Sequence, residues 1–393
     1  MTHELPVRVL ELRCTYGWGG GPDKTILKSA AMHDTSILDI LVVYIRSVHD
    51  HEFSLVARAR SMGVRVEEIV ERSPFDVALV GALLRIIDAN RIQVIHSRDY
   101  KTNFLALLLR TFYRRHIRIV TMAHGWVGRG FKLGMYYTLD KVLASFFDRT
   151  FLLFSGQRAQ FIRKPSLRKT FVVHNAIDHR EWDPALCDRG YLRRELNLPS
   201  DRVVVGFVGR IMPEKDILTM LDVVGELLHV RCRPVVLVLV GESADAGYRE
   251  QVERRVRTRS LENAVVFTGA RTDLRQLYAG FDLFLMTSLQ EGFPNSLLEA
   301  MAMKVPAVVS AIDGIAEILE DGTSGILCRP RDVGGFCNAI ERVLADTALR
   351  ERLLTTARLL VENELSFDRR LRIVEDHYLD LMGVCRPNGS RLW

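Results

Sequence analysis

The chain has 393 residues, of which 48% are hydrophobic and 26% are charged, and its net charge is +6 at pH 7. Such a length suits two ordinary domains, and the apolar content excludes a disordered chain. No stretch approaches the roughly 20 consecutive apolar residues that a membrane-spanning helix needs. The opening residues, MTHELPVRVLEL, lack the basic start and apolar run of a secretory signal. We therefore expect a cytoplasmic protein.

The basic charge is compatible with three kinds of partner: a nucleic acid, an anionic membrane face or a phosphorylated ligand. No zinc-finger, RNP or recognition-helix motif supports the first, so we predict no nucleic-acid partner. The six cysteines are scattered without a C-x-x-C pair, which indicates reduced thiols. HDHE at 49–52 has metal-ligand side chains, but four consecutive residues do not converge on one ion. We predict no bound metal.

Short runs rich in Val, Ile and Leu recur along the chain, each followed by a longer amphipathic stretch. The predicted strands of the first half are 8–14, 37–44, 64–70, 92–97, 117–124, 149–155 and 170–177. Those of the second half are 202–210, 234–241, 264–270, 281–288, 306–311 and 324–328. Apolar strands that alternate with helical patterns of roughly 10–15 residues are typical of a parallel sheet covered on both faces. The predicted fold class is α/β.

The series of strands and helices runs twice, and the segment at 181–200 between the two series has the composition of a linker. We expect two doubly wound, Rossmann-like domains, at 1–180 and 201–365, that face each other across a cleft. The amphipathic stretch at 366–385 has no strand after it, and we expect it to pack back on the N-terminal domain. Because open α/β sheets bind ligands at the carboxyl ends of their strands, function should lie in the loops that follow strands.

The most informative loop contains EGFPNSLLEAMA, directly after a predicted strand. Pro294 suits the first turn of a helix, where its missing N–H costs nothing. The backbone amides near Asn295 and Ser296 are then free to bind a phosphate, supported by the helix dipole. Glu291 and Glu299, beside such an anion site, are suited to accept hydrogen bonds from sugar hydroxyls. The alternative is that both carboxylates are solvated surface charges.

A second cluster lies in FVGRIMPEKD. Gly209 ends a predicted strand, where a small residue lets the backbone approach a ligand. Arg210 and Lys215 flank a turn and are suited to hold both phosphates of a diphosphate, the arginine as a fork and the lysine as a point charge. A structural role explains Lys215 poorly, because a cation at a helix start meets the positive end of the dipole.

The loop TYGWGGGPDKT follows the first predicted strand. Gly20 and Gly21 let backbone amides approach an anion there, although a simple tight turn is the alternative. The loop has neither G-x-G-x-x-G spacing nor G-K-[ST], which argues against a nicotinamide dinucleotide and against a P-loop.

Polar residues also follow the fourth and fifth predicted strands. His124 ends the fifth strand, where an imidazole can bond a sugar hydroxyl or orient a reacting group. A structural histidine is the alternative. Arg98, Asp99 and Lys101 follow the fourth strand and are candidates for the acceptor side of the site, or for a helix N-cap with solvated charges.

Taken in chain order, these motifs resemble the retaining glycosyltransferases of family 4, the group 1 glycosyltransferases, which have the GT-B architecture. EGFPNSLLEAMA resembles the family's signature of two glutamates eight residues apart. GGGPD, AHGW, HNAID, VGRIMPEKD and GARTDLRQLYAGFDLFLMTS match in the same order. The resemblance covers about residues 8–380. It implies a retaining, metal-independent transferase that moves a sugar from a UDP or GDP sugar to a saccharide or lipid-linked saccharide, in polysaccharide or glycolipid biosynthesis.

The resemblance also implies residue roles. Arg210 and Lys215 would bind the donor diphosphate, and the helix amides after Pro294 would assist them. Glu299 would hold the ribose, and Glu291 would contact the transferred sugar. His124 would lie near that sugar, and the backbone of Gly20 and Gly21 near the distal phosphate. No cofactor is implied, because the nucleotide sugar is a substrate.

The sequence departs from the family pattern in three places. Ala176 stands where glycine is common, and Asp216 stands where glycine or asparagine is common. Pro22 and Asp23 stand where many members have a glutamate after a glycine pair. The first two departures leave activity expected, whereas the third weakens the assignment of the N-terminal loop.

Two other functions stay open at this point. A nucleotide-sugar 2-epimerase shares the architecture and the donor, but it acts without an acceptor. A degenerate, non-catalytic sugar-nucleotide-binding protein is expected to have lost Lys215, Glu291 or Glu299, and all three are present. A further hypothesis is peripheral contact with an anionic membrane through the arginine-rich stretch 110–118, which would present a lipid-linked acceptor.

Overall fold

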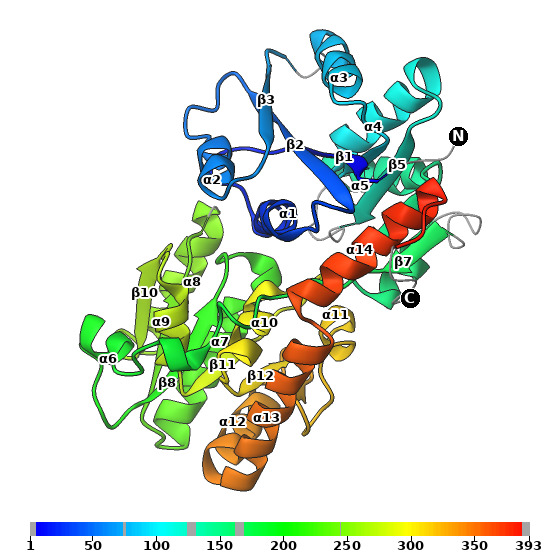
Figure 1. Ribbon diagram of the computed structural model, residues 1–393. Helices are drawn as coiled ribbons and strands as arrows, with labels where there is room; N and C mark the ends of the chain where they lie inside the picture. Colours follow the sequence, from blue (N-terminus) through cyan, green and yellow to red (C-terminus); the bar gives the residue numbers. More distant parts are fainter. Residues whose placement is uncertain (1–4, 74–75, 124–130, 162–168, 244, 387–393) are drawn as a thin grey trace. The chain divides into compact units, whose positions relative to one another are not determined.

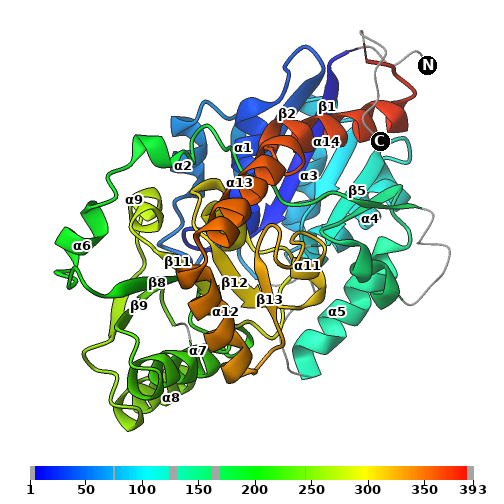
Figure 2. The ribbon, with the colours of Figure 1, turned by 90° about the horizontal axis from the view of Figure 1, so that it is seen from below.

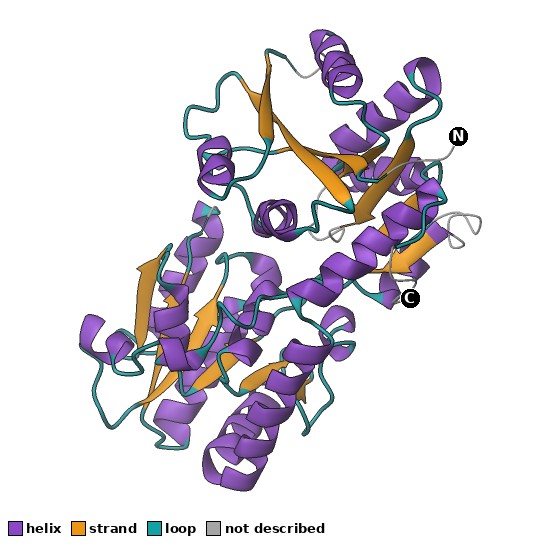
Figure 3. Ribbon diagram, in the orientation of Figure 1, coloured by secondary structure: helices purple, strands orange, loops and turns teal. Residues whose placement is uncertain are grey.

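The computed structural model describes residues 5–73, 76–123, 131–161, 169–243 and 245–386. The chain divides into two compact units, of which unit 1 is Met1–His174 with Asp368–Trp393 and unit 2 is Asn175–Phe367. Each unit is a parallel β-sheet with helices on its two faces, as the strands and helices of Figure 3 show.

Unit 1 contains a seven-stranded sheet in the order β3-β2-β1-β4-β5-β6-β7, with every pair parallel. Its strands are β1 (Val7–Cys14), β2 (Leu38–Ser47), β3 (Val66–Glu71), β4 (Val94–Ser97), β5 (Arg118–Ala123), β6 (Arg149–Leu152) and β7 (Thr170–Val172). Its helices are α1 (Gly21–Met32), α2 (Leu55–Ser61), α3 (Ala78–Ala89), α4 (Tyr100–Leu108), a π-helical turn (Leu109–Tyr113), α5 (Phe131–Ala144) and α14 (Phe367–Met382). Figure 1 labels these elements.

Unit 2 contains a six-stranded parallel sheet in the order β10-β9-β8-β11-β12-β13. Its strands are β8 (Val203–Val208), β9 (Val235–Val240), β10 (Val265–Gly269), β11 (Leu283–Met286), β12 (Ala307–Ser310) and β13 (Ile326–Cys328). Its helices are α6 (Tyr191–Glu195), α7 (Ile217–Gly225), α8 (Ala246–Thr258), α9 (Leu274–Ala279), α10 (Asn295–Ala302), α11 (Asp313–Ala316), α12 (Val333–Ala345) and α13 (Thr347–Asn363).

Apolar side chains on both faces of the strands produce these sheets. In β1, Leu10 and Leu12 belong to a core cluster with residues of α3 and α4. Val9, buried as well, points to the opposite face, because successive strand residues alternate. Strands buried on both faces therefore carry nearly continuous apolar runs, and each of the predicted strands is found at its predicted place.

The strand order reverses at one point in each sheet. In unit 1 the reversal lies between β1 and β4, and in unit 2 it lies between β8 and β11. Doubly wound sheets bind ligands outside the carboxyl ends of the strands at such a reversal. The loops after these four strands are therefore where each unit is expected to bind a ligand.

Two segments lie at the expected domain limits, at 181–200 and at 366–385. The segment 181–200, expected to be a linker, belongs to unit 2 and includes α6, which packs on α9. Helix α14 follows unit 2 in the sequence but belongs to unit 1. Polar contacts hold it there: the hydroxyl of Tyr378 lies 2.5 Å from His96 Nδ1, and Arg149 contacts His377.

Candidate active site

In unit 2 the loops after β8 and β11 are hydrogen-bonded to each other. Thr287 Oγ1 donates to the carbonyl oxygen of Asp216 at 2.9 Å, and the N–H of Leu289 donates to that of Glu214 at 2.8 Å. Asp216 itself adopts a left-handed backbone conformation (φ 48°), which explains why glycine or asparagine suits this position. The predicted phosphate-binding and sugar-binding loops thus meet at the strand-order reversal.

Lys215 and Glu291 form an ion pair at this place. Lys215 Nζ lies 2.5 Å from Glu291 Oε1, and their side chains are 17% and 9% exposed. Ser288 Oγ donates to the same carboxylate oxygen at 2.8 Å. Lys215 has three donor hydrogens, so it can bond a phosphate oxygen while it holds Glu291. The pair therefore offers a cation for a phosphate next to an acceptor for hydroxyls.

The N-terminus of α10 lies in the same loop. Pro294 is the N-cap residue (φ −73°, ψ 116°), so the helix begins at Asn295 and Pro294 precedes its first turn instead of lying inside it. No side chain caps this helix. The N–H groups of Asn295 and Ser296 have no acceptor within the helix, because the first N–H groups of any α-helix lack one. Such a terminus is suited to bind an anion.

Glu299 is a buried residue of α10 and not a solvated one, since it is only 8% exposed. The hydroxyl of Tyr278, on α9, lies 3.0 Å from Glu299 Oε2 and 2.9 Å from the carbonyl oxygen of Ser296. Burial, together with the neighbouring Glu299 carboxylate, raises the pKa of Tyr278 well above its usual value. Tyr278 therefore stays a neutral donor that fixes the carboxylate. Asn295 and Glu299, four residues apart, share one helix face.

The end of β8 lies in close contact with the residue that follows β9. A Cβ on Gly241 would fall 2.0 Å from the carbonyl oxygen of Gly209, so the backbone there tolerates no side chain. Arg210, the next residue, is exposed, and its guanidinium pairs with no other residue that the structure describes. Arg210 is therefore available to a ligand, whereas Lys215 is already paired within the site.

The N-terminal loop differs from its predicted role at Gly20. Its backbone N–H donates to Asp23 Oδ2 at 2.7 Å, so this amide is occupied and does not await an anion. Asp23 is 1% exposed and lies 3.5 Å from Arg13 Nε. The carboxylate of Asp23, a residue that departs from the family pattern, thus accepts the hydrogen bond of the Gly20 amide. Gly21, which begins α1, remains the candidate of the two.

The acceptor-side assignment of Arg98 is wrong, because the side chain is 3% exposed and its Nε and Nη2 donate to Glu11 at 2.8 and 2.9 Å. Asp99 is the N-cap of α4 and accepts two backbone N–H groups of its first turn. Lys101 forms an ion pair with Glu71. Asp99 and Lys101 thus have partners within unit 1, and their assignment to the acceptor side stays a prediction. His124 lies outside the described residues.

Sequence reasoning missed two positions in unit 2. Tyr278 holds Glu299, and the signal available was only a tyrosine in a helix upstream of the signature. Gly314, in α11, would carry a Cβ 1.9 Å from the carbonyl oxygen of Gly292. This contact places α11 directly against the residue that follows Glu291. A glycine soon after β12 was the only sequence signal for it.

Two aromatic side chains of unit 1 that sequence reasoning did not single out are exposed. Tyr16 and Trp18, in the loop between β1 and α1, are 80% and 75% exposed. Their alternation with glycines after the first strand is a readable signal.

Among the described residues, no group of three or more His, Cys, Asp or Glu is placed to hold a metal ion. In HDHE, Asp50 accepts the N–H of Gly17 at 2.7 Å instead.

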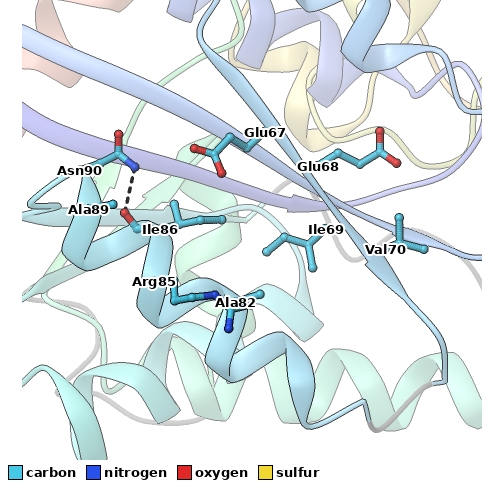
Figure 4. Close-up of a pocket in the computed structure, with 9 residues that line it drawn as sticks. All are labelled: Glu67, Glu68, Ile69, Val70, Ala82, Arg85, Ile86, Ala89 and Asn90. Carbon is cyan, nitrogen blue, oxygen red and sulfur yellow. Dashed lines mark hydrogen bonds between the residues drawn. The ribbon is translucent and has the colours of Figure 1, made fainter.

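A cavity of about 440 Å³ lies elsewhere in unit 1, between β3 and α3 (Figure 4). Glu67 and Ile69 of β3 and Arg85 and Ile86 of α3 are among its lining residues. It follows the edge strand of the sheet and contains none of the predicted site residues. It is therefore not part of the site at either strand-order reversal.

Two family models match the chain. Residues 41–181 match the model described as glycosyltransferase family 4, and residues 202–346 match the model described as glycosyl transferases group 1. Together the matches cover more than half of the chain. The first match lies mostly in unit 1 and runs on to residue 181, just inside unit 2, and the second falls within unit 2.

Relatives and solved structures agree with these matches. UDP-Gal:alpha-D-GlcNAc-diphosphoundecaprenol alpha-1,3-galactosyltransferase of Escherichia coli is 24% identical over 318 residues, 78% of this chain and 80% of that protein. The crystal structure of Anabaena Alr3699/HepE in complex with UDP and glucose aligns with a TM-score of 0.81 at 21% identity, covering 95% of this chain and 100% of that one. Sucrose-phosphate synthase from Thermosynechococcus elongatus aligns with a TM-score of 0.78 at 18% identity, covering 96% and 99%. These structures establish the GT-B fold of paired Rossmann-like sheets.

Proposed function

Because the chain belongs to glycosyltransferase family 4, the group 1 glycosyltransferases, and is therefore a glycosyltransferase, we propose that it is a retaining hexosyltransferase. The donor is a UDP sugar, with a GDP sugar as the alternative, and the acceptor is a saccharide or lipid-linked saccharide. The observation that carries the proposal is the Lys215–Glu291 pair beside the uncapped N-terminus of α10. The UDP complex of the Anabaena protein and the UDP-galactose donor named for the Escherichia coli relative favour UDP.

The diphosphate is held by Arg210, by Lys215 and by the first amides of α10. These groups stabilise the negative charge that develops on the leaving nucleotide diphosphate, which is electrostatic catalysis by preorganised donors. Glu299, fixed by Tyr278, accepts the ribose hydroxyls. No metal ion or cofactor takes part in the proposed reaction, because two cations and a helix terminus supply the positive charge.

The sugar is held by Glu291, which accepts its hydroxyls beside the reacting carbon. The acceptor oxygen forms its bond to the anomeric carbon on the face from which the diphosphate leaves, so the configuration is retained. The proton of the acceptor hydroxyl passes to the departing phosphate oxygen as the bond between that oxygen and the anomeric carbon breaks. His124 is proposed to lie near the donor sugar, and the Gly21 amide near the distal phosphate.

The setting proposed for this reaction is glycan or glycolipid biosynthesis in the cytoplasm. The acceptor named for the Escherichia coli relative is linked to diphosphoundecaprenol, a membrane lipid. A lipid-linked acceptor requires peripheral contact with the anionic inner face of the membrane, which the net charge of +6 favours.

Calorimetric titration of UDP, GDP and ADP without metal, into wild type and a Lys215→Ala, Glu299→Ala double variant, tests the donor site. We expect UDP to bind wild type and to lose at least roughly tenfold in affinity in the variant, since each lost charged hydrogen bond is worth about 1.5–3 kcal/mol. Arg254→Ala removes an exposed cation of α8 and should leave the affinity unchanged. If no nucleotide bound, or if the double variant bound equally well, a degenerate, non-catalytic member would be the better description.

A turnover assay separates the transferase from the epimerase. UDP-galactose is incubated with GlcNAc-diphosphoundecaprenol, the acceptor named for the relative, and with UDP-glucose and UDP-GlcNAc as further donors. Transfer gives a lengthened saccharide and free UDP, and the coupling constant of its new anomeric proton reports retention or inversion. An isomerised UDP sugar that forms without acceptor would instead support the 2-epimerase, and an inverted product would remove the retaining mechanism.

A further inference from the structure

One face of unit 1 is rich in exposed apolar side chains. They come from α4, the π-helical turn after it, α5 and the turn that follows α5, and their exposed fractions run from 44% to 72%. We call this surface the α4–α5 ridge; it comprises Phe104, Phe112, Tyr113, Met135, Leu139 and Phe146. Scattered single exposures are ordinary on a protein surface, but six on neighbouring elements are not.

The elements that carry the ridge pack against each other, because α4 and α5, both labelled in Figure 2, are in contact. The rings of Tyr100 and Tyr136 stack with centroids 4.7 Å apart, and Asn103 Nδ2 donates to Asp140 Oδ1 at 2.6 Å. At the far end, Arg110 Nη2 donates to the carbonyl oxygen of Phe146 at 3.0 Å. The ridge residues are therefore carried on a rigid helix pair.

The opposite faces of these elements already fill the core. Leu105, Ala106 and Leu109 belong to the core cluster of unit 1, and Leu143 and Ala144 are buried. The spacing of the exposed residues also follows the helix period, with Met135 and Leu139 one turn apart. The ridge is thus a second apolar face that no described segment of the chain covers.

The charge around the ridge favours one kind of partner. Residues 100–148, which include the whole ridge, contain eight Lys or Arg against two Asp and no Glu. Arg110 pairs with Asp148 and Arg114 with Asp88, whereas Arg115 is exposed and pairs with no described residue. Apolar and aromatic side chains with a basic surround match the interface of a bilayer that contains anionic lipid. A second copy of the chain would face this surface with the same positive charge, which repels.

We propose that the α4–α5 ridge docks unit 1 on a bilayer containing anionic lipid, with its aromatic side chains at the level of the headgroups. The ridge is the surface that would make the membrane contact of the proposed function. The inference rests on that function in one respect, because a lipid-linked acceptor is the reason for such a contact. No helix in the described ranges is long and apolar enough to cross a bilayer, so the contact is peripheral. The ridge residues belong to unit 1, whereas Lys215, Glu291 and Glu299 belong to unit 2.

The test is co-sedimentation of the full chain with vesicles of phosphatidylcholine, with and without about one third phosphatidylglycerol. We expect wild type to bind the anionic vesicles, less so at high salt because the charges are then screened. A Phe104→Ser, Phe112→Ser variant should lose roughly tenfold or more in its partition coefficient, since two large apolar side chains no longer enter the interface. Arg115→Glu should lower binding to anionic vesicles only.

The matched control is Val77→Ser with Phe267→Ser, which removes two exposed apolar side chains outside the ridge. It should bind like wild type. UDP titration of every variant checks folding and separates the two proposals, because the donor site of unit 2 can be right while the ridge is wrong. Wild type that stays in the supernatant, or a ridge variant that binds like the control, would overturn the inference. So would size-exclusion data in which a wild-type dimer became a monomer in the ridge variant, since a second copy would then be the occupant.

Discussion

Lys215 Nζ and Glu291 Oε1 lie 2.5 Å apart, although 76 residues separate them in the chain. The lysine follows β8 and the glutamate follows β11, and the strand order of the sheet reverses between these two strands. Each side chain therefore holds the other in place at the edge where a doubly wound sheet binds its ligand.

Single and double variants of this pair should be strongly non-additive. Lys215→Ala is expected to lower kcat about 100- to 1000-fold, as loss of one preorganised charge-stabilising group does. Glu291→Gln should lower kcat while UDP binds at least as tightly, because the lysine loses its internal competitor. The double variant should lose less than the product of the two. Initial rates of UDP release and UDP titrations measure all three, and a multiplicative double variant would contradict the coupling.

Gly314→Ala should impair turnover through the position of Glu291. The added Cβ would fall 1.9 Å from the carbonyl oxygen of Gly292, so the loop must move. We expect kcat to fall at least about tenfold, since small misplacements of reacting groups are costly, with little change in the Kd of UDP. Gly334→Ala in α12, whose Cβ would meet its neighbour at an ordinary 3.8 Å, is the control. Equal losses in kcat and UDP affinity would indicate general damage to unit 2.

Tyr278→Phe should weaken nucleotide binding more than it slows the chemical step. The change removes the hydroxyl that lies 3.0 Å from Glu299 Oε2 and leaves that buried carboxylate with one partner fewer. The expected cost is about 1 kcal/mol in unfolding free energy and a several-fold higher Kd for UDP. Urea unfolding and calorimetry measure the two. Unchanged UDP affinity in Tyr278→Phe would remove Glu299 from the proposed ribose site.

Unit 1 should lose stability as the pH falls from about 6.5. Burial, and next the charge of Arg98, lower the pKa of His96 to about 4, and burial followed by Arg149 lowers that of His377 to about 3. Below pH 6.5 the unfolded chain binds these protons and the folded chain does not, so folding weakens by up to about 1.4 kcal/mol per pH unit for each histidine. The effect of the two histidines is measured between pH 6.5 and 4.5, because Glu11 titrates below this range. Glu11 faces His96, as do Arg98, Arg370 and Tyr378.

Urea unfolding followed in unit 1 at several pH values measures this slope. His377→Gln is expected to be less stable at pH 7 and to show a slope smaller by about one proton. If the slope were unchanged in that variant, His377 would not be a group that binds its proton only when the chain unfolds.

The sequence was sufficient for the fold because strands buried on both faces carry an apolar pattern that needs no partner to be recognised. It also led to Lys215 and Glu291, which the structure brings together as an ion pair, since charged residues directly after apolar strands fall at the same edge of a sheet. The buried ion pair of Arg98 was not predictable from the sequence, because its partner Glu11 lies inside a strand 87 residues away. A pattern along the chain does not report which opposite charges meet in three dimensions.

The same limit explains the other differences. Gly20 offers an amide, and only the fold of its own loop shows that Asp23 already takes it. Gly314 and Tyr278 matter because of what lies against them, and packing between distant segments has no local signature. Asp216 is the opposite case, since a departure from a family pattern pointed to a position whose backbone conformation is special.

Because helix α14 belongs to it, unit 1 consists of two segments of the chain that are synthesised at different times. The chain leaves unit 1 after His174 and returns to it only at Asp368, so unit 2 is one contiguous segment whereas unit 1 is not. A growing chain therefore has all of unit 2 before it has the helix that supplies Tyr378 to Glu11 and His96. Unit 2 can become native first, and a fragment that stops before Asp368 would leave the charges of unit 1 without the helix that buries them.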